Sequence, residues 1–130
     1  MVLLREDGMV LDDGIVLRVA EDRFVATVSS SHAGHVLSHL EYWRDLEFAG
    51  RGVALTDVTE AWNVIVAAGP HSHAALQRAL GEAASAVLGQ LAHMDFATLP
   101  WRGRELRVLR ASFSGERAYE LHCRPAVTLE

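Results

Sequence analysis

Adjacent carboxylates at Asp12 and Asp13 are the first group in this 130-residue sequence with the type and spacing to support chemistry. They lie in an apolar, β-branched run, and successive side chains of a strand point to opposite faces. A carboxylate that points inward there needs a partner or a ligand, and it can accept a proton or bind a basic nitrogen. Composition alone favours a second interpretation, an Asp-Gly turn that ends at Gly14.

Three histidines, His32, His35 and His39, share one flank of a helix predicted over residues 31–48. His35 and His39 have the i, i+4 spacing that lets two imidazoles share a metal, so a histidine-based metal hydrolase is one hypothesis. No glutamate lies between them in a metalloprotease pattern, and the sequence indicates no fourth ligand. The favoured interpretation is therefore a solvated flank with no metal.

A strand-to-helix junction is predicted at Gly69-Pro70-His71-Ser72, after an apolar run. Backbone N–H groups at a helix start can bind an anion. The segment lacks the glycine patterns of nucleotide-binding loops. The favoured interpretation is therefore a structural junction, in which Gly69 and Pro70 end the strand and begin the helix.

Residues 113–120 combine a tight turn with two carboxylates and two aromatic rings. Glu120 lies in a predicted strand with Tyr119 on the opposite face, so an inward Glu120 could accept hydrogen bonds from the amino and ring N–H groups of a ligand. The alternative is a hairpin tip with a solvated Glu116. Ser114 is a poor candidate nucleophile because no His–Asp pair is positioned to activate it.

The elements that position these groups indicate an α+β fold. Apolar and alternating runs predict strands at 9–19, 24–28, 53–58, 62–67, 106–113 and 118–123, and helices at 31–48, 71–80 and 82–90. The first two strands form a hairpin. We expect a mostly antiparallel sheet with two or three helices packed on it, in the order β-β-α-β-β-α-β-β.

Composition excludes several classes of protein. Half of the residues are hydrophobic and 22% are charged, which excludes intrinsic disorder. The net charge of −5 disfavours nucleic acid as a partner, and no apolar run approaches the roughly 20 residues of a membrane helix. One cysteine, Cys123, excludes an internal disulfide and favours a reducing, cytoplasmic location.

Both ends of the chain are typical of a piece cut from a longer protein. An apolar strand-like run follows Met1 at once, and the final Leu129-Glu130 is typical of a cloning site before a purification tag. We therefore expect residues 1–128 to be a single domain fragment and residues 129–130 to be a tag remnant.

Four sequence blocks, in order, resemble those of the glycine-cleavage T-protein (aminomethyltransferase) family. Gly8–Gly14, Glu21–Phe24, Val64–Pro70 and Phe113–Leu121 are similar to its G-G-x-x-D-D, E-D-x-F, L-Q-G-P and Y-T-G-E-x-G-Y-E-I blocks. The F-S-G-E-x-A-Y-E variant and the V-T-E-x-W run at Val58–Trp62 are most similar to the T-protein-like part of the alpha subunits of heterotetrameric sarcosine oxidases.

The resemblance implies roles for four residues. The family's strand aspartate, near folate N5 and N10, falls on Asp13, and its pterin-facing glutamate falls on Glu120. The aromatic residue that begins the family's last block falls on Phe113, which keeps a ring for stacking but lacks the hydroxyl. The family's asparagine after the second strand is replaced at about Ser29. We expect Asp13 and Glu120 to point inward on two strands of one sheet. Other family residues lie outside this chain, so the folate pocket is expected to be partial.

The resemblance implies a tetrahydrofolate-binding segment of sarcosine oxidase that supports one-carbon transfer from oxidised sarcosine, giving 5,10-methylenetetrahydrofolate. Flavins and NAD would belong to other parts of a hetero-oligomeric oxidase, whose other subunits would be the partners. The isolated fragment is expected to be inactive. Two alternatives remain. One is a glycine-cleavage T-protein or dimethylglycine-dehydrogenase-like segment, and the other is a non-catalytic interaction module.

Overall fold

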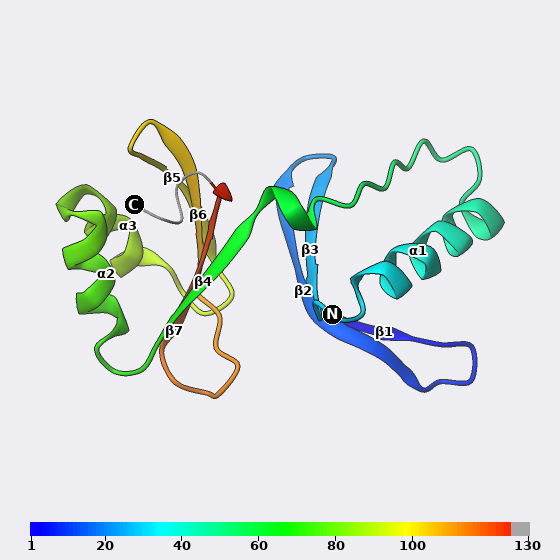
Figure 1. Cartoon of the computed structure of the whole chain (residues 1–130), viewed down its shortest axis with the longest axis horizontal. Helices are drawn as coiled ribbons and strands as arrows, with labels where there is room; N and C mark the ends of the chain where they lie inside the picture. Colours follow the sequence, from blue (N-terminus) through cyan, green and yellow to red (C-terminus); the bar gives the residue numbers. More distant parts are fainter. Residues whose placement is uncertain (126–130) are drawn as a thin grey trace. The chain divides into compact units, whose positions relative to one another are not determined.

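Seven strands and three α-helices follow one another along residues 1–125, the part of the chain that this computed structural model describes, and a short 3-10 helix spans Thr59–Ala61 (Figure 1). In chain order they are β1 Val2–Leu4, β2 Val10–Ala20, β3 Arg23–Val28, α1 Ala33–Glu47, β4 Asn63–Ala68, α2 Ser72–Leu80, α3 Glu82–Gln90, β5 Phe96–Trp101, β6 Arg104–Leu109 and β7 Ala118–Cys123. Every strand pairing is antiparallel, so the predicted α+β class is confirmed. The predicted tag remnant, Leu129 and Glu130, lies outside the described residues.

The chain divides into two compact units. Unit 1, Met1–Asp57, holds a three-stranded sheet in the order β1-β2-β3 together with α1. Unit 2 begins at Val58 and holds a four-stranded sheet in the order β4-β7-β6-β5 together with α2 and α3. The prediction of one sheet is therefore wrong, because the two acidic strands β2 and β7 belong to different sheets. No helix among the described residues is long and apolar enough to cross a membrane.

The long strand β2 changes its partner at Gly14. Asp12 and Asp13 pair with β1, whereas Gly14 and the residues after it pair with β3. The Gly14 N–H also donates a hydrogen bond of 3.0 Å to the carbonyl of Met1. A side chain at this position would collide with the backbone carbonyl of Thr27. Gly14 thus permits a close approach of two strands, and the Asp-Gly turn favoured by composition does not form.

In unit 2, α2 and α3 cover one face of the sheet. Their Leu76 and Leu88 pack into one core cluster with alternate residues of the strands, among them Val108, Tyr119 and Leu121. Tyr119 is completely buried, and its hydroxyl accepts a hydrogen bond of 2.9 Å from the Nε–H of Arg117. The strand residues between these core positions must therefore face the side that neither helix covers.

Several predicted elements differ from the observed ones. The apolar run at 53–58 forms no strand, whereas an unpredicted strand, β5, spans Phe96–Trp101. The strand predicted over 106–113 is β6, which begins at Arg104 and ends at Leu109. Helices α1, α2 and α3 and strand β7 lie where the sequence predicts them, within one or two residues at each end. The predicted element order is therefore correct in outline and wrong in these strands.

Substitution of Gly14 tests the close approach of β2 and β3. We expect Gly14→Ala to lower the free energy of unfolding by about 1–3 kcal/mol, because the new methyl group meets the fixed backbone of Thr27. Urea denaturation followed by circular dichroism measures this change. Gly34→Ala is the matched control: its methyl group meets open space within α1, so stability should stay level or rise by less than about 1 kcal/mol. Equal effects of the two substitutions would contradict the assignment.

Candidate functional site

Asp12, and not Asp13, is the inward carboxylate of β2. Its exposed fraction is 5%, whereas Asp13 on the opposite face of the strand is exposed. Both Asp12 oxygens are used: Oδ2 accepts a hydrogen bond of 2.9 Å from the backbone N–H of Ser29, and Oδ1 accepts one of 2.7 Å from the Ser29 hydroxyl. The expectation that Asp13 points inward is therefore wrong, because strand alternation assigns that direction to its neighbour.

The environment of Asp12 favours its ionised form. The hydroxyl of Ser29 lowers the pKa of this carboxyl below its ordinary value; the backbone N–H groups of Ser29 and Asp13 and the nearby His32 add to the effect, and burial opposes it. The His32 Nδ1 atom lies 3.7 Å from Asp12 Oδ1. Asp12 therefore joins β2 to the start of α1 and is poorly suited to take up a proton at neutral pH.

Ser29 serves this junction as well. It follows β3, and both its backbone and its hydroxyl hydrogen donate to Asp12. Its proposed contact with folate remains a prediction. The role assigned to Asp13 also remains a prediction, and the exposed position of this residue leaves its carboxylate accessible to a ligand.

Glu120 of β7 faces the side of its sheet that α2 and α3 do not cover. The flanking residues Tyr119 and Leu121 are in the core cluster, so the predicted alternation of Tyr119 and Glu120 across the sheet is confirmed. Across the sheet, Glu120 is paired with Val66 on β4 and Leu109 on β6. Its side chain is 25% exposed. A partly accessible acceptor between apolar neighbours suits one edge of a flat ring that carries N–H donors.

The histidine at position 122 was missed by sequence reasoning. Its Nε2 atom lies 3.3 Å from Glu120 Oε2, and its side chain is 4% exposed. The i, i+2 spacing along a predicted strand was the available signal, because such residues share one face.

Phe113 lies in the loop between β6 and β7, and its ring is fully exposed. Its predicted stacking against a ligand is not tested by this arrangement. Asp13 and Glu120 lie in different units, so their convergence on one ligand likewise stays a prediction.

The junction after β4 has a structural role. Gly69 has a φ of 109°, and its N–H donates to the carbonyl of Arg117 at 2.9 Å. The hydroxyl of buried Ser72 donates to the same carbonyl at 3.0 Å. These bonds join the start of α2 to the residue before β7. This agrees with the favoured interpretation, in which the segment is a structural junction and not an anion site.

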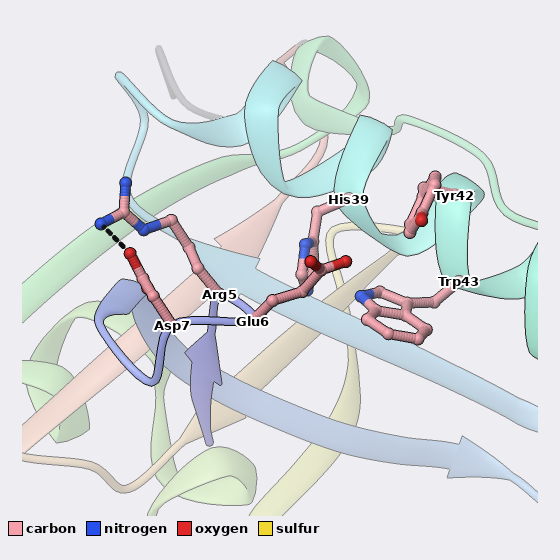
Figure 2. Close-up of a pocket in the computed structure, with 6 residues that line it drawn as sticks. All are labelled: Arg5, Glu6, Asp7, His39, Tyr42 and Trp43. Carbon is pink, nitrogen blue, oxygen red and sulfur yellow. Dashed lines mark hydrogen bonds and ion pairs between the residues drawn. The ribbon is translucent and has the colours of Figure 1, made fainter.

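One of the three helical histidines, His39, borders a hollow in unit 1 that sequence reasoning did not find. Figure 2 shows His39, Tyr42 and Trp43 of α1 opposite residues 5–7 of the β1–β2 loop, around an open hollow of about 390 Å³. Within that loop Arg5 forms an ion pair of 2.9 Å with Asp7. The described residues contain no group of three histidine, cysteine, aspartate or glutamate side chains arranged to hold a metal ion. That part of the chain therefore offers no third ligand beside His35 and His39, as the metal-hydrolase hypothesis would require.

Acid titration tests the junction at Asp12. A lowered pKa in the folded state stabilises the fold above the unfolded pKa, and this contribution is lost as the pH falls through the folded value. We therefore expect Asp12→Asn to reduce the loss of stability below about pH 4. Urea denaturation at several pH values measures the slope. Asp13→Asn is the control and should keep the original slope, because the Asp13 side chain takes no part in the Asp12 hydrogen bonds; a change as large as that of Asp12→Asn would refute the assignment.

Comparison with known proteins identifies the family. Residues 1–129 match the family described as the GCVT N-terminal domain. The chain is 38% identical over 121 residues to the sarcosine oxidase subunit alpha of Corynebacterium sp. (strain P-1), and 36% identical over 123 residues to that of Rhizobium meliloti (strain 1021). Each alignment covers 92% of this chain and 12% of the relative.

A second group of relatives carries a different name. The chain is 33% identical over 125 residues to the aminomethyltransferase of Chlorobaculum parvum (strain DSM 263 / NCIMB 8327), an alignment that covers 95% of the chain and 32% of that relative. The chain thus spans about one eighth of the alpha subunits and about one third of the aminomethyltransferase. The resemblance stated from the four sequence blocks is confirmed, and this chain belongs to the GCVT N-terminal domain family.

Proposed function

We propose that this chain is a tetrahydrofolate-binding segment of a sarcosine oxidase alpha subunit. The proposal rests on the sequence identity of 36–38% between this chain and three such subunits, over 92% of its length. The proposal includes the other subunits of a cytoplasmic hetero-oligomeric oxidase as partners. It assigns flavin and NAD chemistry to parts of the parent protein outside this chain.

The side of the four-stranded sheet that carries Glu120, which neither helix covers, would receive a reduced pterin. Val64 and Val66 on β4 are 47% and 61% exposed and offer an apolar surface beside Glu120. The Glu120 carboxylate would accept hydrogen bonds from the amino and ring N–H groups of the pterin. Phe113 would contribute a ring for stacking against the ligand. Ser29 would lie near Asp13, the second acidic residue of the proposed site.

Bound tetrahydrofolate would supply two nitrogens, N5 and N10, that take over the one-carbon unit of oxidised sarcosine, so that 5,10-methylenetetrahydrofolate leaves. If that unit arrives as formaldehyde, its carbon replaces the hydrogens of both nitrogens and its oxygen leaves as water. The oxidation itself would use the flavin that the proposal assigns to other parts of the parent oxidase. Asp13 would take up a proton at its exposed carboxylate, because Asp12 has both oxygens engaged with Ser29.

An aminomethyltransferase segment is the second candidate, supported by the relative from Chlorobaculum parvum. Both candidates use the same folate residues, so folate binding does not separate them. The donor of the one-carbon unit does: oxidised sarcosine in one case and an aminomethyl group in the other.

Folate binding tests the role of Glu120. We expect 5-formyltetrahydrofolate, a stable reduced folate, to bind the chain saturably in isothermal titration calorimetry. Glu120→Gln should weaken this binding about tenfold, because a charged acceptor is replaced by a neutral one. Glu82→Gln, at an exposed position of α3 on the other side of the sheet from Glu120, should leave affinity unchanged. A folded chain without saturable binding up to millimolar folate would support the interaction module instead.

One-carbon transfer tests the role of Asp13. In the oxidase that contains this chain, Asp13→Asn should reduce formation of the methylene product by about 10²-fold or more, because the proton acceptor is lost. Oxygen consumption with sarcosine should stay within about twofold, since flavin oxidation does not use this side chain. Formaldehyde should then accumulate in place of the methylene product. Unchanged partition between the two products would remove Asp13 from the transfer step.

A further inference from the structure

Three polar side chains are buried in the described part of the chain: Asp12, Ser72 and His122. A buried polar group normally has a hydrogen-bond partner. Asp12 is bound to Ser29, and Ser72 is bound to the carbonyl of Arg117. Both of these bonds join segments far apart in the sequence, so both have a clear structural purpose.

The bond of His122 has a different character. Its partner is Glu120, two residues earlier on the same strand and on the same face, so this bond joins no separate segments of the fold. An ionised carboxylate has only acceptor sites, so the imidazole must donate through Nε2–H to Glu120 Oε2, at 3.3 Å. The bond fixes the rotation of the carboxylate and engages one of its two oxygens.

The surroundings of Glu120 make His122 its one hydrogen-bonding side chain within residues 1–125. The cross-strand neighbours of Glu120, Val66 and Leu109, are apolar and cannot donate. Its second oxygen, Oε1, forms no hydrogen bond with any described residue. The carboxylate is therefore oriented by one bond and left with a free acceptor site.

A cation on this face, Arg107, is already engaged. Arg107 of β6 is the cross-strand neighbour of His122, while Val64 of β4 lies on its other side. The Arg107 Nε–H donates to Glu105 Oε1 at 2.7 Å, and its guanidinium lies 4.1 Å from the ring centre of Trp62. Among the described residues Arg107 contacts Glu105 and Trp62, and the hydrogen bond to the Glu120 side chain comes from His122.

We propose that His122 is a positioning residue that holds Glu120 with Oε1 free for the N–H edge of a planar nitrogen heterocycle. This inference rests on the proposed folate-binding function and adds to it a specificity-determining side chain outside the sequence blocks of the family resemblance. A free oxygen at fixed orientation selects ligands that present an amino or ring N–H donor along their edge.

Titration of 5-formyltetrahydrofolate into the whole chain, followed by calorimetry, tests the inference. His122→Leu should weaken binding about tenfold, as expected for the loss of one oriented, charged hydrogen bond. His122→Gln should recover affinity to within about threefold, because its amide can donate from nearly the same place as Nε2. His93→Leu, at an exposed histidine of the same unit, is the matched control and should have no effect.

A double-substitution cycle separates positioning from general support of the fold. In a Glu120→Gln background, His122→Leu should change affinity by less than about twofold, because its effect passes through the carboxylate. An equal loss in both backgrounds would overturn the inference, and so would a His122→Leu variant that binds like the original chain. If His122→Leu does not fold, as judged by circular dichroism, His122→Asn replaces it, since its shorter amide does not reach Oε2.

Folate binding by the original chain separates failure of the proposed function from failure of the role of His122. If it does not bind the folate at all, the proposed function fails, and the role of His122 fails with it. If it binds and the His122 variants bind equally well, only the inference about His122 fails and the proposed function stands.

Discussion

A β-strand sends successive side chains to opposite faces, and both candidate acidic sites depend on this constraint. In β2 it turns Asp12 inward and leaves Asp13 exposed. In β7 it places Tyr119 in the core and Glu120 on the face without helices. A shift of one position in either strand would exchange these directions, so that Asp13 would turn inward in place of Asp12 and Glu120 in place of Tyr119. The hydrogen bonds of Asp12 and the buried ring of Tyr119 therefore define the register on which any ligand site rests.

The sequence was most informative where periodic apolar residues meet a core. Strand β7 was predicted with its observed ends, because Tyr119, Leu121 and Cys123 alternate and all three are buried. Strand β5 was not predicted, and it contains Pro100, which cannot donate a backbone hydrogen bond. The sheet tolerates this proline because β5 lies at an edge. The run at 53–58 has strand composition but pairs with neither sheet, and composition carries no information about a partner.

The orientation of the acidic pair was beyond prediction for a related reason. Alternation guarantees that Asp12 and Asp13 point apart, yet it does not say which one points inward. That choice goes with Ser29, seventeen positions from Asp12, whose N–H and hydroxyl both donate to the Asp12 carboxylate. The turn predicted at Gly14 is wrong for the same reason. A glycine after aspartate is typical of a turn, but here it is required by the closeness of Thr27 on the neighbouring strand.

The two aspartates differ in what their carboxylates are free to do. A proton acceptor must have an accessible lone pair and must not be stabilised too strongly in its charged form. Asp12 fails on both counts, because its oxygens are occupied and its pKa is held below the ordinary value. Those same bonds fix the backbone on which Asp13 stands. The buried, fully bonded Asp12 carboxylate thus acts as a structural support. Its exposed neighbour Asp13 keeps an accessible carboxylate, which is what the proposed proton transfer requires of it.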